Sequence, residues 1–220
     1  MSATVAQPRG AISHPRLIAA CTIGTALEFY DFVVFSFFAR TIGQLFFPSQ
    51  DPTAQLLLSF ATYGVGFFLR PLGGVVLGAY ADRKGRKKAT VLTLMLIALG
   101  TAMIGLAPVY ATAGIAGPVI VVLGRLIQGF SAGGEVGAST TLLAEYAPKD
   151  RRGFFGSWQL ASQGMAVLAA AAAAFIINTN LTPAEVSAWG WRIPFLLGVL
   201  IVPIGLWLRR ARQRARRAYA

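Results

Sequence analysis

Four ionisable side chains lie inside long apolar stretches of this 220-residue sequence. Glu28 and Asp31 are three residues apart, which places both on one face of a helix. Arg70 is followed directly by Pro71, and Arg125 lies ten residues into its own apolar stretch. An ionised side chain at bilayer depth costs about 2.5 to 3.5 kcal/mol, so each of these residues needs a partner or a function.

Two interpretations of these charges stay open. In the functional one, the side chains line a polar cavity in which Arg125 or Arg70 binds an anionic substrate, and Glu28 or Asp31 takes up and releases a proton. In the structural one, the four charges neutralise each other as pairs between helices. Glu135 lies further along the same apolar stretch as Arg125, nearer the cytoplasmic end, and fits either interpretation.

The sequence offers no nucleophile motif and no metal centre. Cys21 and His14 are the single cysteine and the single histidine, which leaves no disulfide framework and no cluster of metal ligands. It also lacks a Gly-x-Ser-x-Gly motif. We therefore expect no enzymatic activity, no cofactor and no metal.

The elements that hold these charges are predicted from composition and hydropathy. The chain is 55% hydrophobic and 13% charged, with a mean hydropathy of +0.62, whereas an ordinary soluble domain is about 25% charged. A transmembrane helix takes about 20 apolar residues. We expect an all-α membrane protein in which an N-terminal arm (1–16) precedes a six-helix bundle (17–208) and a basic tail (209–220) follows it. The expected spans are 17–39, 54–80, 88–108, 115–143, 153–177 and 190–208.

The distribution of basic residues predicts the orientation of these spans. The net charge is +12, and 16 of the 20 Lys and Arg residues fall in the arm, the second and fourth gaps and the tail, all on one side of the membrane. Cytoplasmic segments carry the excess of Lys and Arg. We expect both termini on the cytoplasmic side of the cell (inner) membrane. The charge then reflects topology and contact with the lipid bilayer, and it does not indicate a nucleic-acid partner.

Glycine spacing predicts close helix packing. Gly129, Gly133 and Gly137 repeat every four residues on one face of the fourth span, and Gly74 and Gly78 have the same spacing in the second. Small residues at this spacing let another helix backbone approach closely.

A short charged turn follows the second span. Between Gly78 and Lys87, one carboxylate, Asp82, stands among several cations, with Gly85 at the turn. We interpret the segment as a tight cytoplasmic turn whose Asp82 pairs with a neighbouring helix end or an arginine and acts as a latch between conformations. The residues assigned to this loop motif are Gly78, Asp82, Arg83, Gly85 and Arg86.

The spacing of this turn resembles the loop signature of the major facilitator superfamily, which lies between transmembrane helices 2 and 3. Other segments resemble the metabolite:proton symporter family within it. These are residues 28–32, 68–74, 124–135 and 189–195. Within that family the closest resemblance is to citrate- and tricarballylate-type carriers, through residues 123–134 and 157–163. Other members carry α-ketoglutarate, shikimate, or proline and betaine.

The resemblance implies a secondary active transporter that moves a small organic acid such as citrate together with protons, by alternating access between two six-helix bundles. It also implies that Arg125 faces the first-helix carboxylates and takes part in proton coupling. Gln128, Gln159 and Gln163 either line the cavity or form hydrogen bonds between helices. The Gly-Pro signature of antiporters is missing from the fifth span, which favours symport.

Members of the family are about twice as long and contain two homologous halves, so this chain corresponds to the N-terminal six-helix half. The alternative to transport is a truncated, non-transporting membrane protein that keeps the half-fold and needs a partner half to act. The expected partners are therefore a small organic anion, protons, the bilayer, and a second six-helix half or a homodimer.

Overall fold

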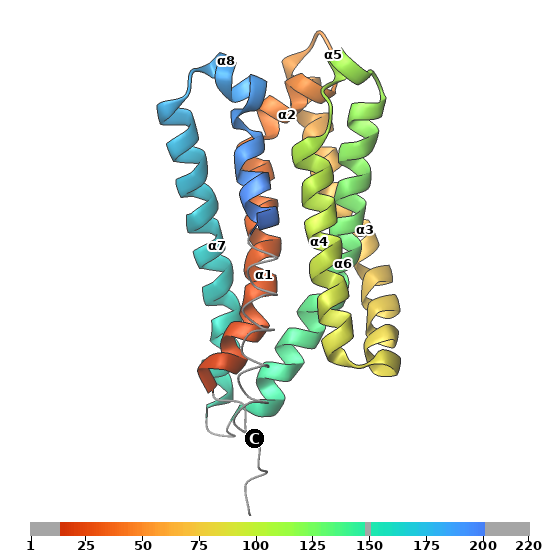
Figure 1. The fold of residues 1–220 in the computed structure, drawn as a ribbon, viewed down its shortest axis with the longest axis vertical. Coiled ribbons are helices and arrows are strands. Elements are labelled where there is room, and N and C mark those ends of the chain that lie inside the picture. The colour runs from red at the N-terminus through yellow and green to blue at the C-terminus, as the bar shows by residue number, and fades with distance from the viewer. Residues whose placement is uncertain (1–13, 148–150, 201–220) are drawn as a thin grey trace, which may run out of the picture.

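The computed structural model describes residues 14–147 and 151–200, except for the side chains of residues 14–21, 23, 24, 86, 87 and 135–146. All regular structure in this part of the chain is helical (Figure 1), as expected from the sequence. The elements are α1 (His14–Phe37), α2 (Ala39–Phe46), α3 (Pro52–Lys84), α4 (Arg86–Leu106), α5 (Tyr110–Ala113), α6 (Ala116–Tyr146), α7 (Arg152–Asn180), α8 (Pro183–Glu185) and the π-helix η1 (Val186–Gly190). Residues 192–200 are also helical.

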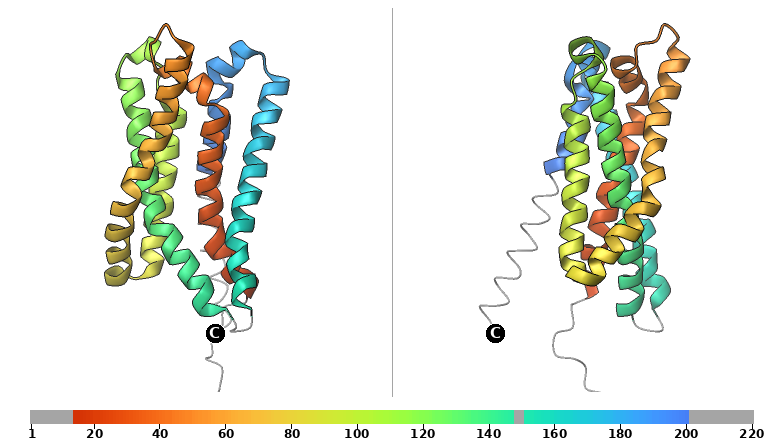
Figure 2. Two further views of the ribbon diagram at one scale, coloured as in Figure 1. Left: turned by 180° about the vertical axis from the view of Figure 1, so that it is seen from behind. Right: turned by 90° about the vertical axis from the view of Figure 1, so that its right-hand side faces the viewer.

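The long helices run side by side in two groups (Figures 1 and 2). One group contains α3, α4 and α6, with α6 packed against both of the others. The other contains α1, which packs along α7, and residues 192–200 beside it. Contacts between α1 and α6 join the two groups. As a result α1, which carries both buried carboxylates, lies in the middle of the bundle.

Four described helices are long and apolar enough to cross a membrane: Pro52–Lys84, Lys88–Leu106, Ala116–Gly134 and Arg152–Asn180. They correspond to the second to fifth expected spans, although the helices of the second and fifth are longer at both ends. The predicted spans are shorter because a hydropathy pattern ends at the first polar residues, whereas the helix continues through them to a capping residue. Asp51 accepts a hydrogen bond of 2.8 Å from the Thr53 amide at the start of α3. The sixth expected span extends beyond the described residues, and several side chains of the first are not described, so the number of six spans stays a prediction.

Two short helical segments lie where the sequence predicts connections. The chain continues after α1 into α2, which buries Ile42 and Phe46 while Arg40 stays exposed. Between α7 and the last helix, Thr182 and Glu185 form a capping box that starts α8, and η1 follows it. These segments are too short to register as apolar spans, and they close the end of the bundle opposite the α3–α4 turn (Figure 1).

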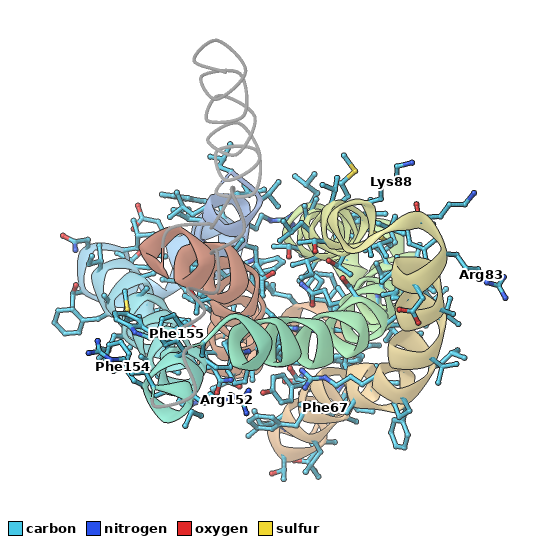
Figure 3. The ribbon with its side chains drawn as sticks, turned by 90° about the horizontal axis from the view of Figure 1, so that it is seen from below. Phe67, Arg83, Lys88, Arg152, Phe154 and Phe155 are labelled. Carbon is cyan, nitrogen blue, oxygen red and sulfur yellow. The ribbon has the colours of Figure 1, made fainter. Side chains whose placement is uncertain are left out.

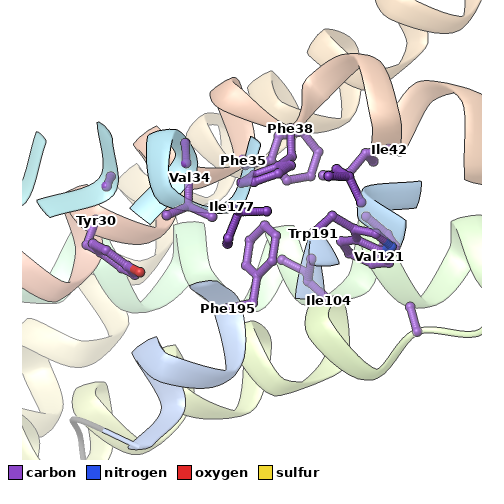
Figure 4. Packing of buried hydrophobic residues seen from close by; sticks show 14 of the residues in the cluster. Tyr30, Val34, Phe35, Phe38, Ile42, Ile104, Val121, Ile177, Trp191 and Phe195 are labelled. Carbon is purple, nitrogen blue, oxygen red and sulfur yellow. The ribbon is translucent and has the colours of Figure 1, made fainter. Parts of the chain in front are cut away.

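A cluster of buried aromatic and aliphatic side chains holds the two groups of helices together near this end (Figure 4). Trp191 is fully buried and packs edge-to-face against Phe46, with ring centroids 5.6 Å apart, and lies 6.0 Å from the ring of Phe195. Phe35 and Phe38 add the contribution of α1. This core fixes the position of α1 relative to α6 and to residues 192–200.

Glycines bring α3 and α6 into backbone contact. A Cβ atom placed on Gly66 would lie 2.8 Å from the carbonyl oxygen of Arg125, and one on Gly129 would collide with the backbone of Gly66. A Cβ on Gly133 would collide with the carbonyl of Arg70. The close approach predicted from the spacing of Gly129 and Gly133 is therefore confirmed, with α3 as the partner helix.

Candidate functional site

The first part of the candidate site is an ion pair between α1 and α3. An Nη2 nitrogen of Arg70 lies 2.7 Å from Oε1 of Glu28. The Glu28 side chain is 2% exposed, whereas that of Arg70 is 26% exposed. The guanidinium carbon of Arg70 also lies 4.4 Å from the ring centroid of Phe67 and 4.9 Å from that of Phe32. Figure 3 shows Phe67 at the edge of the bundle, so this pair lies near an accessible face.

The second part is a hydrogen-bonded chain that connects α1, α4 and α6. Oδ2 of Asp31 accepts hydrogen bonds from the Thr101 hydroxyl and, at 3.2 Å, from the Gln128 amide. The same amide nitrogen lies 2.9 Å from the Thr101 oxygen, and Oε1 of Gln128 accepts a 2.9 Å hydrogen bond from Arg125. Gln128 thus stands between Asp31 and Arg125 and links them through both ends of its amide.

Arg125 is completely enclosed, with no exposed surface. Its guanidinium carbon lies 3.9 Å from the ring centroid of Phe35, 5.4 Å from that of Phe32 and 5.7 Å from that of Tyr63. Cation–π contacts with a desolvated guanidinium are worth about 2 kcal/mol. This enclosure stabilises the charge and also separates it from water.

The structure thus brings together the four charged residues selected from the sequence, but it divides them between two neighbourhoods. Glu28 and Asp31 are both buried side chains of α1. Glu28 contacts α3, whereas Asp31 contacts α4 and α6. An interhelical ion pair forms for Glu28 and Arg70, and the connection between Asp31 and Arg125 runs through Gln128. Several of their buried polar atoms have no hydrogen-bond partner among the described residues: Oε2 of Glu28, Oδ1 of Asp31, Nε of Arg70, and Nε and Nη2 of Arg125.

Thr101 and the aromatic residues around the arginines are missing from the sequence-based selection. Thr101 contacts Asp31 and Gln128, yet a threonine in an apolar helix ordinarily bonds to its own backbone and gives no signal. In the segment Glu28–Phe–Tyr–Asp31–Phe, aromatic residues stand between and directly after the two acids, and this pattern could have identified Phe32.

Of the other selected glutamines, Gln159 donates a 2.8 Å hydrogen bond to the Thr25 hydroxyl, which joins α7 to α1. Gln163 is partly buried on α7. Glu135 belongs to helix α6, but its side chain is outside the described part of the structure.

The loop motif forms the turn between α3 and α4. Gly85 has φ +90°, a conformation that L side chains rarely adopt, and it both ends α3 and precedes α4. Asp82 and Arg83 are exposed, with no ion-pair partner for Asp82 among the side chains described; the side chain of Arg86 is not among them. A Cβ atom on Gly78 would meet open space, so this glycine is not required for packing here.

A groove of about 820 Å³ between α1, α7 and residues 192–200 does not include the charged residues. Its walls are apolar and include Leu27, Tyr30 and Ile176. The described residues also contain no group of three His, Cys, Asp or Glu side chains that could hold a metal ion. The chemistry of the site therefore rests on two carboxylates, two guanidinium groups and neutral hydrogen-bonding side chains.

Residues 17–209 match the family model described as sugar (and other) transporter. The chain belongs to this family. It is 49% identical over 193 residues to a citrate-proton symporter of Klebsiella pneumoniae, which covers 88% of this chain and 44% of that protein. It is 46% identical over 196 residues to a citrate-proton symporter of Salmonella typhi, covering 89% of this chain and 45% of that protein. The chain thus spans less than half the length of these relatives.

Similarity also extends to transporters of other solutes and to a solved fold. A proline/betaine transporter of Escherichia coli K12 is 39% identical over 196 residues, covering 89% of this chain and 39% of that protein. The proton:xylose symporter XylE, a major facilitator superfamily structure, superimposes with a TM-score of 0.72 at 20% identity, over 86% of this chain and 44% of XylE. The resemblance to the major facilitator superfamily and to citrate-type symporters is confirmed, and the chain is a multi-pass membrane protein of a transporter family.

Proposed function

We propose that this chain provides the N-terminal half of a proton-coupled secondary transporter for a small organic acid such as citrate. The observation that carries the proposal is the group of two carboxylates and two guanidinium groups inside the bundle, all buried except the partly exposed Arg70. Charges in a membrane interior are costly and are typical of substrate and proton pathways. Similarity to two citrate-proton symporters supports an organic anion as the substrate.

Within this proposal, the residues that contact the substrate or carry the proton are Glu28, Asp31, Arg70, Arg125 and Gln128. Arginine binds carboxylates through a planar fork of N–H donors, so either guanidinium suits an organic anion. The carboxylates supply proton acceptors within the same group. Glu135, Gln159 and Gln163 remain candidates for the same pathway.

We also propose that the end of the bundle with the α3–α4 turn faces the cytoplasm of the inner membrane, together with both termini. Arg83, Lys88 and Arg152 lie at this end (Figure 3), which supports the orientation because cytoplasmic loops carry the excess of Lys and Arg. The exposed Asp82 at the same turn is then available for the proposed latch. In a Cys21→Ala background, Lys84→Cys should react with an impermeant maleimide only after the membrane is opened, whereas Thr182→Cys should react in intact cells.

The transport proposal is tested by uptake of radiolabelled citrate in cells that have no other route for citrate. The chain is expressed alone and together with the remaining part of the Klebsiella symporter. We expect uptake that is abolished by a protonophore and by Arg125→Ala, but retained by Arg40→Ala, which removes an exposed arginine on α2. Uptake in the second arm alone would support the alternative, a half that needs a partner. Absence of uptake in both arms, with the chain present in the membrane, would refute the transport proposal.

A further inference from the structure

The two arginines of the site differ in how a ligand could reach them. Arg125 has no exposed surface, and three aromatic rings and Gln128 surround its guanidinium group. Arg70 is 26% exposed, although its Nε is buried and has no hydrogen-bond partner among the described residues. A ligand can reach Arg70 without first separating α6 from α1 and α3.

The two carboxylates differ in the same sense. Asp31 is held on Oδ2 by Thr101 and Gln128, and its other side meets the last helix, because a Cβ on Gly198 would lie 2.9 Å from Oδ1. Among the described residues, Glu28 has one polar contact, the 2.7 Å contact of Oε1 with Arg70, and Oε2 has no partner. A pair of this kind often forms two parallel N–H···O bonds, whereas here a single nitrogen contacts a single oxygen. The guanidinium group of Arg70 is therefore only partly used by Glu28.

The rings beside Arg70 hold its guanidinium group while leaving donors free. Phe67 and Phe32 lie within 4.9 Å of the guanidinium carbon. Contacts with ring faces do not consume N–H groups, so the Nη hydrogens that Glu28 does not use stay available for a second carboxylate.

We propose that a carboxylate of the substrate binds Arg70 in place of Glu28, and that Glu28 takes up a proton as it is displaced. This inference rests on the proposed function and deepens it, because it assigns anion binding to Arg70 and coupling to Glu28. Arg125, Gln128 and Asp31 form the closed part of the site. In the exchange, the Glu28 carboxylate gains one proton and becomes a neutral acid, the ion pair with Arg70 breaks, and a new ion pair with the substrate carboxylate forms.

The charge balance of the site explains why binding should bring in a proton. With all four groups ionised, Glu28 and Asp31 compensate Arg70 and Arg125, and the group is neutral. Of the other titratable side chains on neighbouring elements, Tyr63 lies beside Arg125 and adds no charge when protonated. An added substrate carboxylate leaves one buried negative charge uncompensated, which is strongly unfavourable. Protonation of Glu28 restores the neutrality of the group, so one proton is taken up for each substrate carboxylate that binds.

The test measures citrate binding to the purified chain in nanodiscs by calorimetry, in buffers of different ionisation heat, which gives the number of protons taken up. The native chain should take up one proton more per citrate than Glu28→Gln, a comparison that cancels protonation of citrate itself. Because Glu28→Gln mimics the protonated acid, its affinity should equal or exceed the native affinity at pH 8 and change less with pH. In uptake assays it should lose accumulation against a gradient but keep citrate exchange.

Arg70→Gln should weaken citrate binding about 30-fold or more, the loss that follows from truncating one partner of a buried charge pair. That variant leaves Glu28 without its counter-charge, so the double variant Glu28→Gln with Arg70→Gln, which removes both charges together, is measured beside it and should bind equally weakly. Glu185→Gln and Arg40→Gln change an exposed glutamate and an exposed arginine elsewhere and should behave as the native chain does.

The outcomes separate the two proposals. If the native chain binds citrate but Glu28→Gln takes up as many protons, or if the folded double variant binds as tightly as the native chain, the exchange at Arg70 is wrong while transport stands. If the native chain does not bind citrate, and supports no citrate uptake either alone or with the remaining part of the Klebsiella symporter, the proposed function itself fails for this substrate, and the inference fails with it.

Discussion

Replacing Gly66 by alanine should separate α3 from α6 and destabilise the fold, whereas the same change at Gly64 should not. The two glycines are two residues apart on α3 and therefore point in different directions. A Cβ on Gly66 would lie 2.8 Å from the backbone oxygen of Arg125, while a Cβ on Gly64 would meet no atom within 4 Å. Ordinary contacts begin at 3.4 Å, so the helices must move apart locally by about 0.6 Å, and neither backbone can rotate away as a side chain could.

The magnitude follows from the comparison of the two variants. Alanine gains about 1 kcal/mol over glycine in a helix interior, and this gain is common to both positions. The additional clash at Gly66 costs about 1 to 3 kcal/mol, the range for overpacking a well-packed interior. We therefore expect Gly64→Ala to be neutral or stabilising, and Gly66→Ala to be less stable than Gly64→Ala by that range.

The assay is reversible unfolding in mixed micelles, followed by tryptophan fluorescence, because Trp191 is buried in the core. A difference of 1.4 kcal/mol changes the ratio of folded to unfolded protein tenfold, which this measurement resolves. Equal stabilities of Gly64→Ala and Gly66→Ala would refute the conclusion that the α3–α6 distance is limited by glycine contacts.

Other predictions concern contacts away from the charged group. Gln159→Leu should cost about 0.5 to 1.5 kcal/mol of unfolding free energy by removing the 2.8 Å hydrogen bond to Thr25, and a double-mutant cycle with Thr25→Val should show that the two effects are not additive. Arg192→Gln should loosen the end of α4, since Arg192 donates a 3.1 Å hydrogen bond to the carbonyl of Gly105, and amide exchange near residue 105 should rise. Hydrogen bonds from Thr182 lower the pKa of Glu185 below its ordinary value of 4.5. The stabilisation by the capping box is therefore fully present above pH 4.5 and is lost as the pH falls through the lowered pKa that Glu185 has in the folded protein. Protection of the Glu185 amide against exchange should fall over this acidic range and stay constant between pH 6 and 8.

The four charged residues can be selected from the sequence alone, because charged residues in apolar stretches are rare and this is visible without a structure; their role in the site stays a prediction. The sequence was not sufficient to pair them. Glu28 and Asp31 share a helix face by spacing, but α1 lies between α3 on one side and α4 and α6 on the other, so residues one turn apart contact different helices. The pairing depends on the rotation of each helix about its axis, and hydropathy does not encode that rotation.

The glycine pattern illustrates the same limit for the fold. The spacing of Gly129 and Gly133 predicts a close helix neighbour, and the structure supplies α3 as that neighbour. Gly74 of the second-span repeat does lie on this contact, since a Cβ on it would lie 3.3 Å from the carbonyl oxygen of Gly133. The spacing did not reveal that Gly66, eight residues earlier on the same face, meets Gly129, because a single glycine forms no repeat. The short helix α2 was missed for a different reason, since its eight residues bury only one side against the bundle.

The glycine contacts and the charged group belong to one arrangement, because two of the glycines meet the backbone of the two arginines. Gly66 packs against the carbonyl of Arg125, and Gly133 packs against the carbonyl of Arg70. The distance between α3 and α6 therefore sets how far apart the two guanidinium groups stand and how tightly Arg125 is enclosed. A change that widens this contact by a fraction of an ångström, such as Gly66→Ala, should admit water to Arg125 and weaken the difference in access between the two arginines, so that citrate binding becomes less dependent on Arg70 in the folded variant than in the native chain.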